Sequence, residues 1–178
     1  IGGCCGTTPS HIKAIKAALQ NSTPQRRIRE NLSGQVALTS RSRTVYLGSK
    51  QPTRIIGERI NPTGRKALAA EIKSGSFLGV KREALGQIEA GADILDVNMG
   101  VPGIDQSAAM NKAFHELAML TDAPLAIDTT DATALEAALK AYPGRALINS
   151  VSAEKERLRD FLPLAKKYGA AILCLPLS

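Results

Sequence analysis

Several residue types are scarce in this sequence of 178 residues, and each scarcity narrows what the protein can do. There is no tryptophan, and with three tyrosines and three phenylalanines the chain lacks aromatic platforms on which nucleic-acid bases could stack. No apolar run approaches the ~20 residues that span a bilayer, and the first residues lack the basic and then apolar pattern of a signal peptide. We therefore expect no nucleic-acid partner, no membrane association and a cytoplasmic location.

Acidic residues are outnumbered by basic ones, 16 against 23, which gives a formal charge of +7. Much of the excess lies in one short polar stretch that contains Glu30 as its acid. The basic residues there are Arg26, Arg27, Arg29, Arg41, Arg43, Lys50 and Arg54. Such a cluster indicates a solvated linker or a surface that meets an acidic partner domain.

Cysteine is also scarce. The chain has three cysteines, and an odd number argues against a disulfide framework. Cys174 falls in an apolar run and is expected in the core. Cys4 and Cys5 are flanked by glycines, which let the backbone bend so that neighbouring thiolates point at one tetrahedral zinc. Two sulfurs do not complete such a site, so a further ligand must come from elsewhere. The alternative is that both are small buried side chains.

Strands and helices are expected to alternate along most of the chain. A first helix is predicted over 11–19, and the polar stretch over 20–53, with two short extended pieces, is interpreted as an interdomain linker. Apolar runs then predict strands over 54–60, 93–99, 124–129, 145–152 and 170–178. Helical spacing predicts helices over 77–91, 104–121, 131–142 and 154–169.

Strands separated by helices imply parallel pairing, either in an open doubly wound sheet or in a β/α barrel. Polar residues favour the barrel because they fall within or just after the strands, and the carboxyl ends of barrel strands converge on one mouth. These residues are Glu58, Asn61, Asp96, Asn98, Asp128, Asn149 and Ser150. The sequence stops after the fifth expected strand, whereas a closed barrel has eight. We therefore expect an α/β fold, a (β/α)8 barrel truncated after about five strands.

Asp128 and Asn149 are the strongest candidate pair, because they end consecutive strands. A carboxylate accepts two hydrogen bonds and an amide both donates and accepts, which suits one edge of a flat heterocycle. The alternative is that each only caps the following helix.

Glu58 and Asp96 are acids within apolar strands, where an unpaired charge is costly, so each needs a partner such as Arg59 or a backbone donor. Together with Asn61 and Asn98 they could contact a ligand or form an internal polar network. No dinucleotide or phosphate-binding fingerprint accompanies them.

These motifs together resemble cobalamin-dependent methionine synthase. The stretch "IGGCCGTTPSHIKAI" is similar to the end of its homocysteine-binding barrel, and "GGCC" to two of its three zinc-binding cysteines. The stretch from "RIIGERINPTGR" through "ADILDVNMG" and "LAIDTT" to "RALINSVSAEKER" is similar to the first part of its methyltetrahydrofolate-binding barrel. The resemblance implies a pterin-binding barrel over 54–178, preceded by the terminal helix of another barrel over 1–19.

The resemblance also implies an activity, in which a methyl group passes from 5-methyltetrahydrofolate through cobalamin to homocysteine. Zinc would be held by Cys4 and Cys5, and the pterin by Asp128 and Asn149. Asp96 and Asn98 would add to the pocket, and Glu58 and Asn61 are candidates for it from their own positions at the end of the first strand. No catalytic residue is assigned. Cobalamin would be carried by a further domain, in cis or in trans, and the fragment would supply parts of both sites.

Three other functions stay open. The barrel residues alone also resemble pterin methyltransferases that act on corrinoid proteins and, more distantly, dihydropteroate synthase, which joins a pterin to an aromatic amine. A dihydropteroate synthase would not need "GGCC" in front of the barrel. A non-catalytic fragment that binds other modules through its basic stretch is the third alternative.

Overall fold

The computed structural model of this chain describes residues 3–20 and 34–177. These residues belong to two compact units that divide between Ser33 and Gly34. Arg26, Arg27 and Arg29 of the basic stretch lie outside the described residues.

In the described part of the first unit, residues 3–20, the structure has the helix α1 (Pro9–Leu19), as the spacing of its apolar residues predicted. Thr8 precedes the helix, and its backbone N–H donates to Nδ1 of His11 at 3.1 Å. Proline at the first helical position has no N–H to leave unpaired, which favours a start here. His11 therefore accepts a hydrogen bond from the residue that precedes the helix and stabilises the helix N-terminus, which is a structural role for this histidine.

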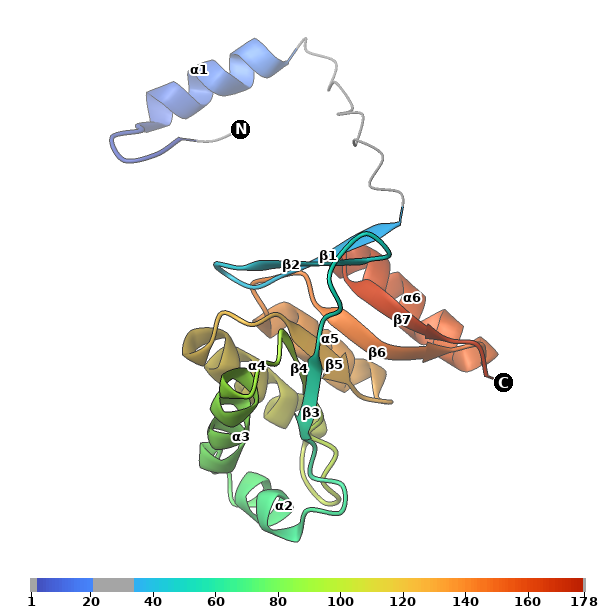
Figure 1. Cartoon of the computed structure of the whole chain (residues 1–178). Coiled ribbons are helices and arrows are strands. Elements are labelled where there is room, and N and C mark those ends of the chain that lie inside the picture. Colours follow the sequence, from blue (N-terminus) through green and yellow to red (C-terminus); the bar gives the residue numbers. More distant parts are fainter. Residues whose placement is uncertain (1–2, 21–33, 178) are drawn as a thin grey trace. The chain divides into compact units, whose positions relative to one another are not determined.

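The second unit is built on one parallel sheet of β3 to β7, in that order across the sheet (Figure 1). The strands are β3 (Ile56–Ile60), β4 (Ile94–Val97), β5 (Leu125–Asp128), β6 (Leu147–Ser152) and β7 (Ala171–Leu175). The helices are α2 (Lys66–Lys73), α3 (Leu78–Glu89), α4 (Gln106–Leu120), α5 (Ala132–Ala141) and α6 (Lys155–Tyr168). The expected α/β fold is confirmed, and this order is that of the first part of a β/α barrel. Among residues 34–177 the strands form an open sheet and do not close.

Local signals explain where several helices begin and end. Asp131 caps α5, because its carboxylate accepts from the backbone N–H groups of Thr133 and Ala134. Gly169 ends α6 with a φ of 67°, a left-handed conformation that glycine adopts without a Cβ clash. Helix α2 was not predicted. The loop sequence "NPTG" ends just before it, and a loop was expected between the first strand and the helix over 77–91.

The two faces of the sheet are buried by different parts of the chain. Helices α2 to α6 pack on one face and form the larger apolar core, which includes the buried side chains of Leu95, Phe114 and Phe161. A smaller cluster lies on the other face. It consists of Leu38, Val45, Ile94, Ala126, Leu147 and Ala171.

Leu38 and Val45 of this smaller cluster come from a hairpin of β1 (Gln35–Thr39) and β2 (Thr44–Gly48), which pair antiparallel. The hairpin lies within the stretch expected to be a linker, where short extended pieces were anticipated. Tyr142 at the end of α5 donates its hydroxyl to the carbonyl of Thr39 at 2.9 Å and so joins the hairpin to the sheet unit. Arg43 and Arg54 of the basic stretch both pair with Asp93, at 3.4 and 3.3 Å. This part of the basic stretch therefore stabilises the second unit.

None of the helices in the described ranges is both long and apolar enough to cross a membrane.

Candidate functional site

The carboxyl-terminal ends of β4, β5 and β6 bring the expected polar residues together above an apolar floor. Side chains alternate between the faces of a strand, so residues two positions apart share a face. Ile94 precedes Asp96, Ala126 precedes Asp128, and Leu147 precedes Asn149, and the three apolar residues belong to the smaller cluster. The polar side chains therefore lie one layer nearer the strand ends, on the face opposite the helices.

Two side-chain hydrogen bonds connect the three strands. Asn98, just after β4, donates from Nδ2 to Oδ2 of Asp128 at 2.9 Å. Asn149 donates from Nδ2 to Oδ1 of Asp96 at 3.2 Å. Asp128 and Asn149 are also direct partners in the register of β5 and β6. Four of the six expected pocket residues thus form two hydrogen-bonded carboxylate and amide pairs that the β5 and β6 register places side by side, together called the carboxylate and amide network.

Asn98 is further oriented by its own backbone, because its Oδ1 accepts from the N–H of Gly100 at 2.7 Å. Because this hydrogen bond fixes the amide oxygen of Asn98, the amide NH2 group of the same side chain points toward Asp128. Asn98, Asp128 and Asn149 are each partly exposed, so their remaining hydrogen-bonding capacity is open to a ligand.

Asp96 is the most deeply buried member, at 2% exposure. Burial raises the pKa of its carboxyl group to about 7, against the lowering effect of the Asn149 hydrogen bond, and the nearby carboxylates of Asp128 and Glu58 raise it further. Near neutral pH this carboxyl group therefore exists in both protonation states. It can act as a hydrogen-bond donor or as an acceptor toward a ligand.

Glu58 and Asn61 take different positions from the network. Glu58 is exposed on β3, close enough to affect Asp96 electrostatically. Arg59, considered as its partner, instead pairs with Glu83 at 3.1 Å, because adjacent strand residues point to opposite faces. Asn61 accepts from the N–H of Thr63 at 2.9 Å and so shapes the loop that follows β3.

Two residues that the sequence did not single out support the loop after β5. The buried hydroxyl oxygen of Thr129 accepts from Nε2 of Gln106 at 3.0 Å and from the backbone N–H of Asp131 at 3.1 Å. The run of hydroxyl and acid residues "DTTD" over 128–131 was an available signal for such a turn. Gln106 opens α4 and carries no comparable signal.

Cys4 and Cys5 are free and exposed, just before α1. Two adjacent thiols fit as part of a zinc donor set. In the described ranges, 3–20 and 34–177, no three His, Cys, Asp or Glu side chains are grouped so as to hold a metal ion. Cys174 lies on β7 as expected, but it is exposed rather than in the core, because β7 has one neighbouring strand in the described sheet.

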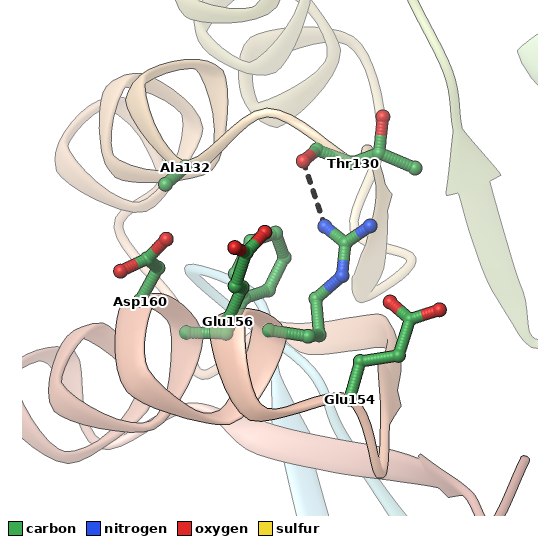
Figure 2. A pocket seen from close by; sticks show the side chains of 7 residues that line it. Thr130, Ala132, Glu154, Glu156 and Asp160 are labelled. Carbon is green, nitrogen blue, oxygen red and sulfur yellow. Dashed lines mark hydrogen bonds between the residues drawn. The ribbon is translucent and has the colours of Figure 1, made fainter. Parts of the chain in front are cut away.

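A pocket lies beside the network, between the loop after β5 and the first turns of α6 (Figure 2). Its lining includes Thr130, three acids and an arginine. The acids are Glu154, Glu156 and Asp160. None of the four network residues lines it, so it is a separate feature of the same end of the sheet.

Comparison with protein families gives two matches. Residues 57–177 match the pterin binding enzymes, and this range contains the sheet from the second residue of β3 onward and the whole carboxylate and amide network. The chain belongs to the pterin binding enzyme family. Residues 1–19 match the homocysteine S-methyltransferases, and this range contains Cys4, Cys5 and α1.

The two matches, in this order along the chain, confirm the resemblance to the homocysteine-binding and pterin-binding domains of methionine synthase. They place the chain among enzymes of folate and homocysteine methyl transfer. A folate and homocysteine fit as the small-molecule substrates of these two domains.

Proposed function

We propose that this chain provides the pterin site for methyl transfer from 5-methyltetrahydrofolate, through cobalamin, to homocysteine. The observation that supports the proposal most strongly is the network of Asp96, Asn98, Asp128 and Asn149 at the strand ends of a pterin-family sheet. A pterin presents amino, ring N–H and carbonyl groups along one edge. A carboxylate and an amide on neighbouring strands are complementary to such an edge.

In this proposal each member has a separate part. Asp128 accepts hydrogen bonds from the pterin edge, and Asn149 donates to it and accepts from it. Asn98 orients the Asp128 carboxylate through its hydrogen bond. Asp96 adjusts its protonation to the ligand, because its pKa of about 7 allows either state near neutral pH. Glu58 and Asn61 border the pocket on the β3 side.

The homocysteine part of the proposal rests on Cys4 and Cys5. Their thiolates would hold zinc together with a ligand from outside the described residues, and the metal would keep homocysteine in its thiolate form near neutral pH. Cobalamin would be carried on another domain, in cis or in trans. The match of residues 1–19 to homocysteine S-methyltransferases favours this function over a dihydropteroate synthase, which has no use for homocysteine.

The proposal is tested by titrating methyltetrahydrofolate against the full-length protein and two variants. Asp128→Ala should weaken binding by about 2–4 kcal/mol, because a charged partner is lost from a partly buried polar contact. Asn149→Ala should cost less, about 1–2 kcal/mol, because a neutral amide forms weaker hydrogen bonds.

The matched control is Asp131→Ala, three positions further on, which removes a helix cap without removing a network residue. Asp131→Ala should reduce stability and leave folate affinity close to wild type. Unchanged affinity in Asp128→Ala, with circular dichroism also unchanged, would remove Asp128 from the pterin site.

A further inference from the structure

Arg157 connects the two elements that carry the central residues of the network. It lies in the first turn of α6, which directly follows β6 and Asn149. Its Nη1 donates to the backbone carbonyl of Thr130 at 2.7 Å, two residues after Asp128 (the dashed line in Figure 2). One side chain thus spans from the β6 and α6 connection to the loop after β5.

The Arg157 guanidinium packs over the ring of Phe161, which lies one helical turn later in α6. The guanidinium carbon lies 4.5 Å from the centroid of the Phe161 ring, within the range of a cation–π contact. Phe161 is 2% exposed and belongs to the main core. A planar guanidinium on a rigid ring has little freedom, so the hydrogen bond to Thr130 has a defined direction.

The surroundings of Arg157 argue against a role in binding an anionic ligand. Glu154, Glu156 and Asp160 line the same pocket, and their charges repel carboxylates and phosphates. Asp160 is itself occupied by Arg159, with contacts of 2.7 and 3.0 Å. Within the described residues, no carboxylate lies within salt-bridge distance of Arg157. The carbonyl of Thr130 is therefore its polar partner.

The loop that Arg157 contacts is already fixed on its other side. Gln106 of α4 donates to the Thr129 hydroxyl, and Arg157 of α6 donates to the next residue's carbonyl. The segment after Asp128 is thus clamped between the helices that follow β4 and β6. Small displacements of this segment would move the Asp128 carboxylate relative to Asn149.

We propose that Arg157 is a positioning residue of the pterin site, which holds the loop after Asp128 through the Thr130 carbonyl and so fixes the orientation of the Asp128 carboxylate relative to Asn149. The inference rests on the proposed function, and it assigns to α6 a part in substrate affinity that lies outside the network itself. It predicts that affinity for the folate depends on a hydrogen bond that makes no contact with it.

The test measures methyltetrahydrofolate binding and steady-state kinetics in the full-length protein. Arg157→Leu keeps an apolar side chain on Phe161 but removes the hydrogen bond, and it should weaken folate binding about tenfold. The effect should appear in the KM for the folate with kcat little changed. Arg157→Lys retains one donor and should restore most of the affinity, which a purely structural defect would not do.

Arg159→Leu is the matched control, since it removes an exposed arginine two positions away that contacts Asp160 instead of the loop. It should leave folate affinity unchanged. Wild-type affinity in Arg157→Leu, or an equal loss in Arg159→Leu, would overturn the inference while leaving the proposed function intact. If Arg157→Leu is too unstable to measure, an equal loss in Arg157→Lys and Arg157→Met would overturn it as well, because the lysine donor should still reach the carbonyl and methionine has no donor. Wild-type protein that does not bind the folate would instead overturn the proposed function.

Discussion

Asp96 lies beneath the amide of Asn149, and the carboxylates of Glu58 and Asp128 are its charged neighbours. Its pKa, raised by burial to about 7, means that the folded protein binds a proton more tightly at this residue than the unfolded chain does. Ionisation of Asp96 therefore lowers the free energy of unfolding of the folded protein. Residues with such perturbed titration are concentrated at functional sites, which agrees with the proposed role of the network.

This cost predicts a specific pH dependence of stability. As pH rises from the ordinary value of 3.8 to about 7, the unfolded chain loses the Asp96 proton while the folded protein keeps it. The contribution of Asp96 to the free energy of unfolding therefore falls across that window, by an amount on the order of 4 kcal/mol, and this contribution is level on either side of it. Asp96→Asn keeps the shape and can still accept from Asn149, but it does not titrate. Urea unfolding near pH ~4.5 and ~7.5 should show a smaller decline in the variant than in wild type. Parallel pH profiles for the two proteins would contradict the assigned cause.

At the scale of elements, the β1 and β2 hairpin depends on contacts far away in the sequence. Tyr142 is 6% exposed, donates its hydroxyl to the carbonyl of Thr39 and accepts from the N–H of Leu125 at 3.2 Å. Burial raises the pKa of this phenol to about 12, so it stays a neutral donor at physiological pH. The hydroxyl thus joins β1 to the start of β5.

Removing that hydroxyl should loosen the hairpin. Tyr142→Phe leaves the buried N–H of Leu125 and the partly buried carbonyl of Thr39 without this partner, and should lower the free energy of unfolding by about 1–3 kcal/mol. Tyr46→Phe is the control, because Tyr46 lies on the same hairpin at 42% exposure, and its effect should stay within about 0.5 kcal/mol. Urea unfolding of the two variants makes the comparison. Equal effects would mean that the Tyr142 hydroxyl does not secure the hairpin.

The sequence predicted local elements better than the contacts between them. Helix α5 and its Asp131 cap, and the end of α6 at Gly169, follow from signals within a few residues. The packing of Leu38 onto Ala126 and its neighbours depends on segments almost ninety residues apart, for which one sequence carries no signal. The same holds at the site. Asp128 and Asn149 were identified from their strand ends, whereas the bonds to Asn98 and Asp96 depend on strand register.

At the scale of the whole molecule, the sheet of the second unit has two open edges in the described residues. β3 and β7 each pair with one other strand. On β3 the backbone N–H of Arg59 donates to the side chain of Gln87 and its carbonyl accepts from Arg65, so β7 is the more open of the two edges. Large apolar side chains accompany these edges. Ile55, Ile56, Leu173 and Leu175 are exposed by 57%, 41%, 47% and 42%. Exposed strand edges with apolar side chains are sites at which another strand can pair.

The 178-residue chain produced alone should therefore self-associate through these edges. Sedimentation velocity over a range of concentrations should show species larger than a monomer, because edge pairing covers both backbone groups and apolar surface. Leu173→Lys places a charge on β7 and should shift the population toward monomer. Leu78→Lys is the control, since Leu78 is a still more exposed leucine, at 70%, but lies in the first turn of α3 rather than on a strand, and it should leave association unchanged. A monodisperse wild-type monomer with cooperative unfolding would contradict the prediction and would show that the open sheet is stable as it stands.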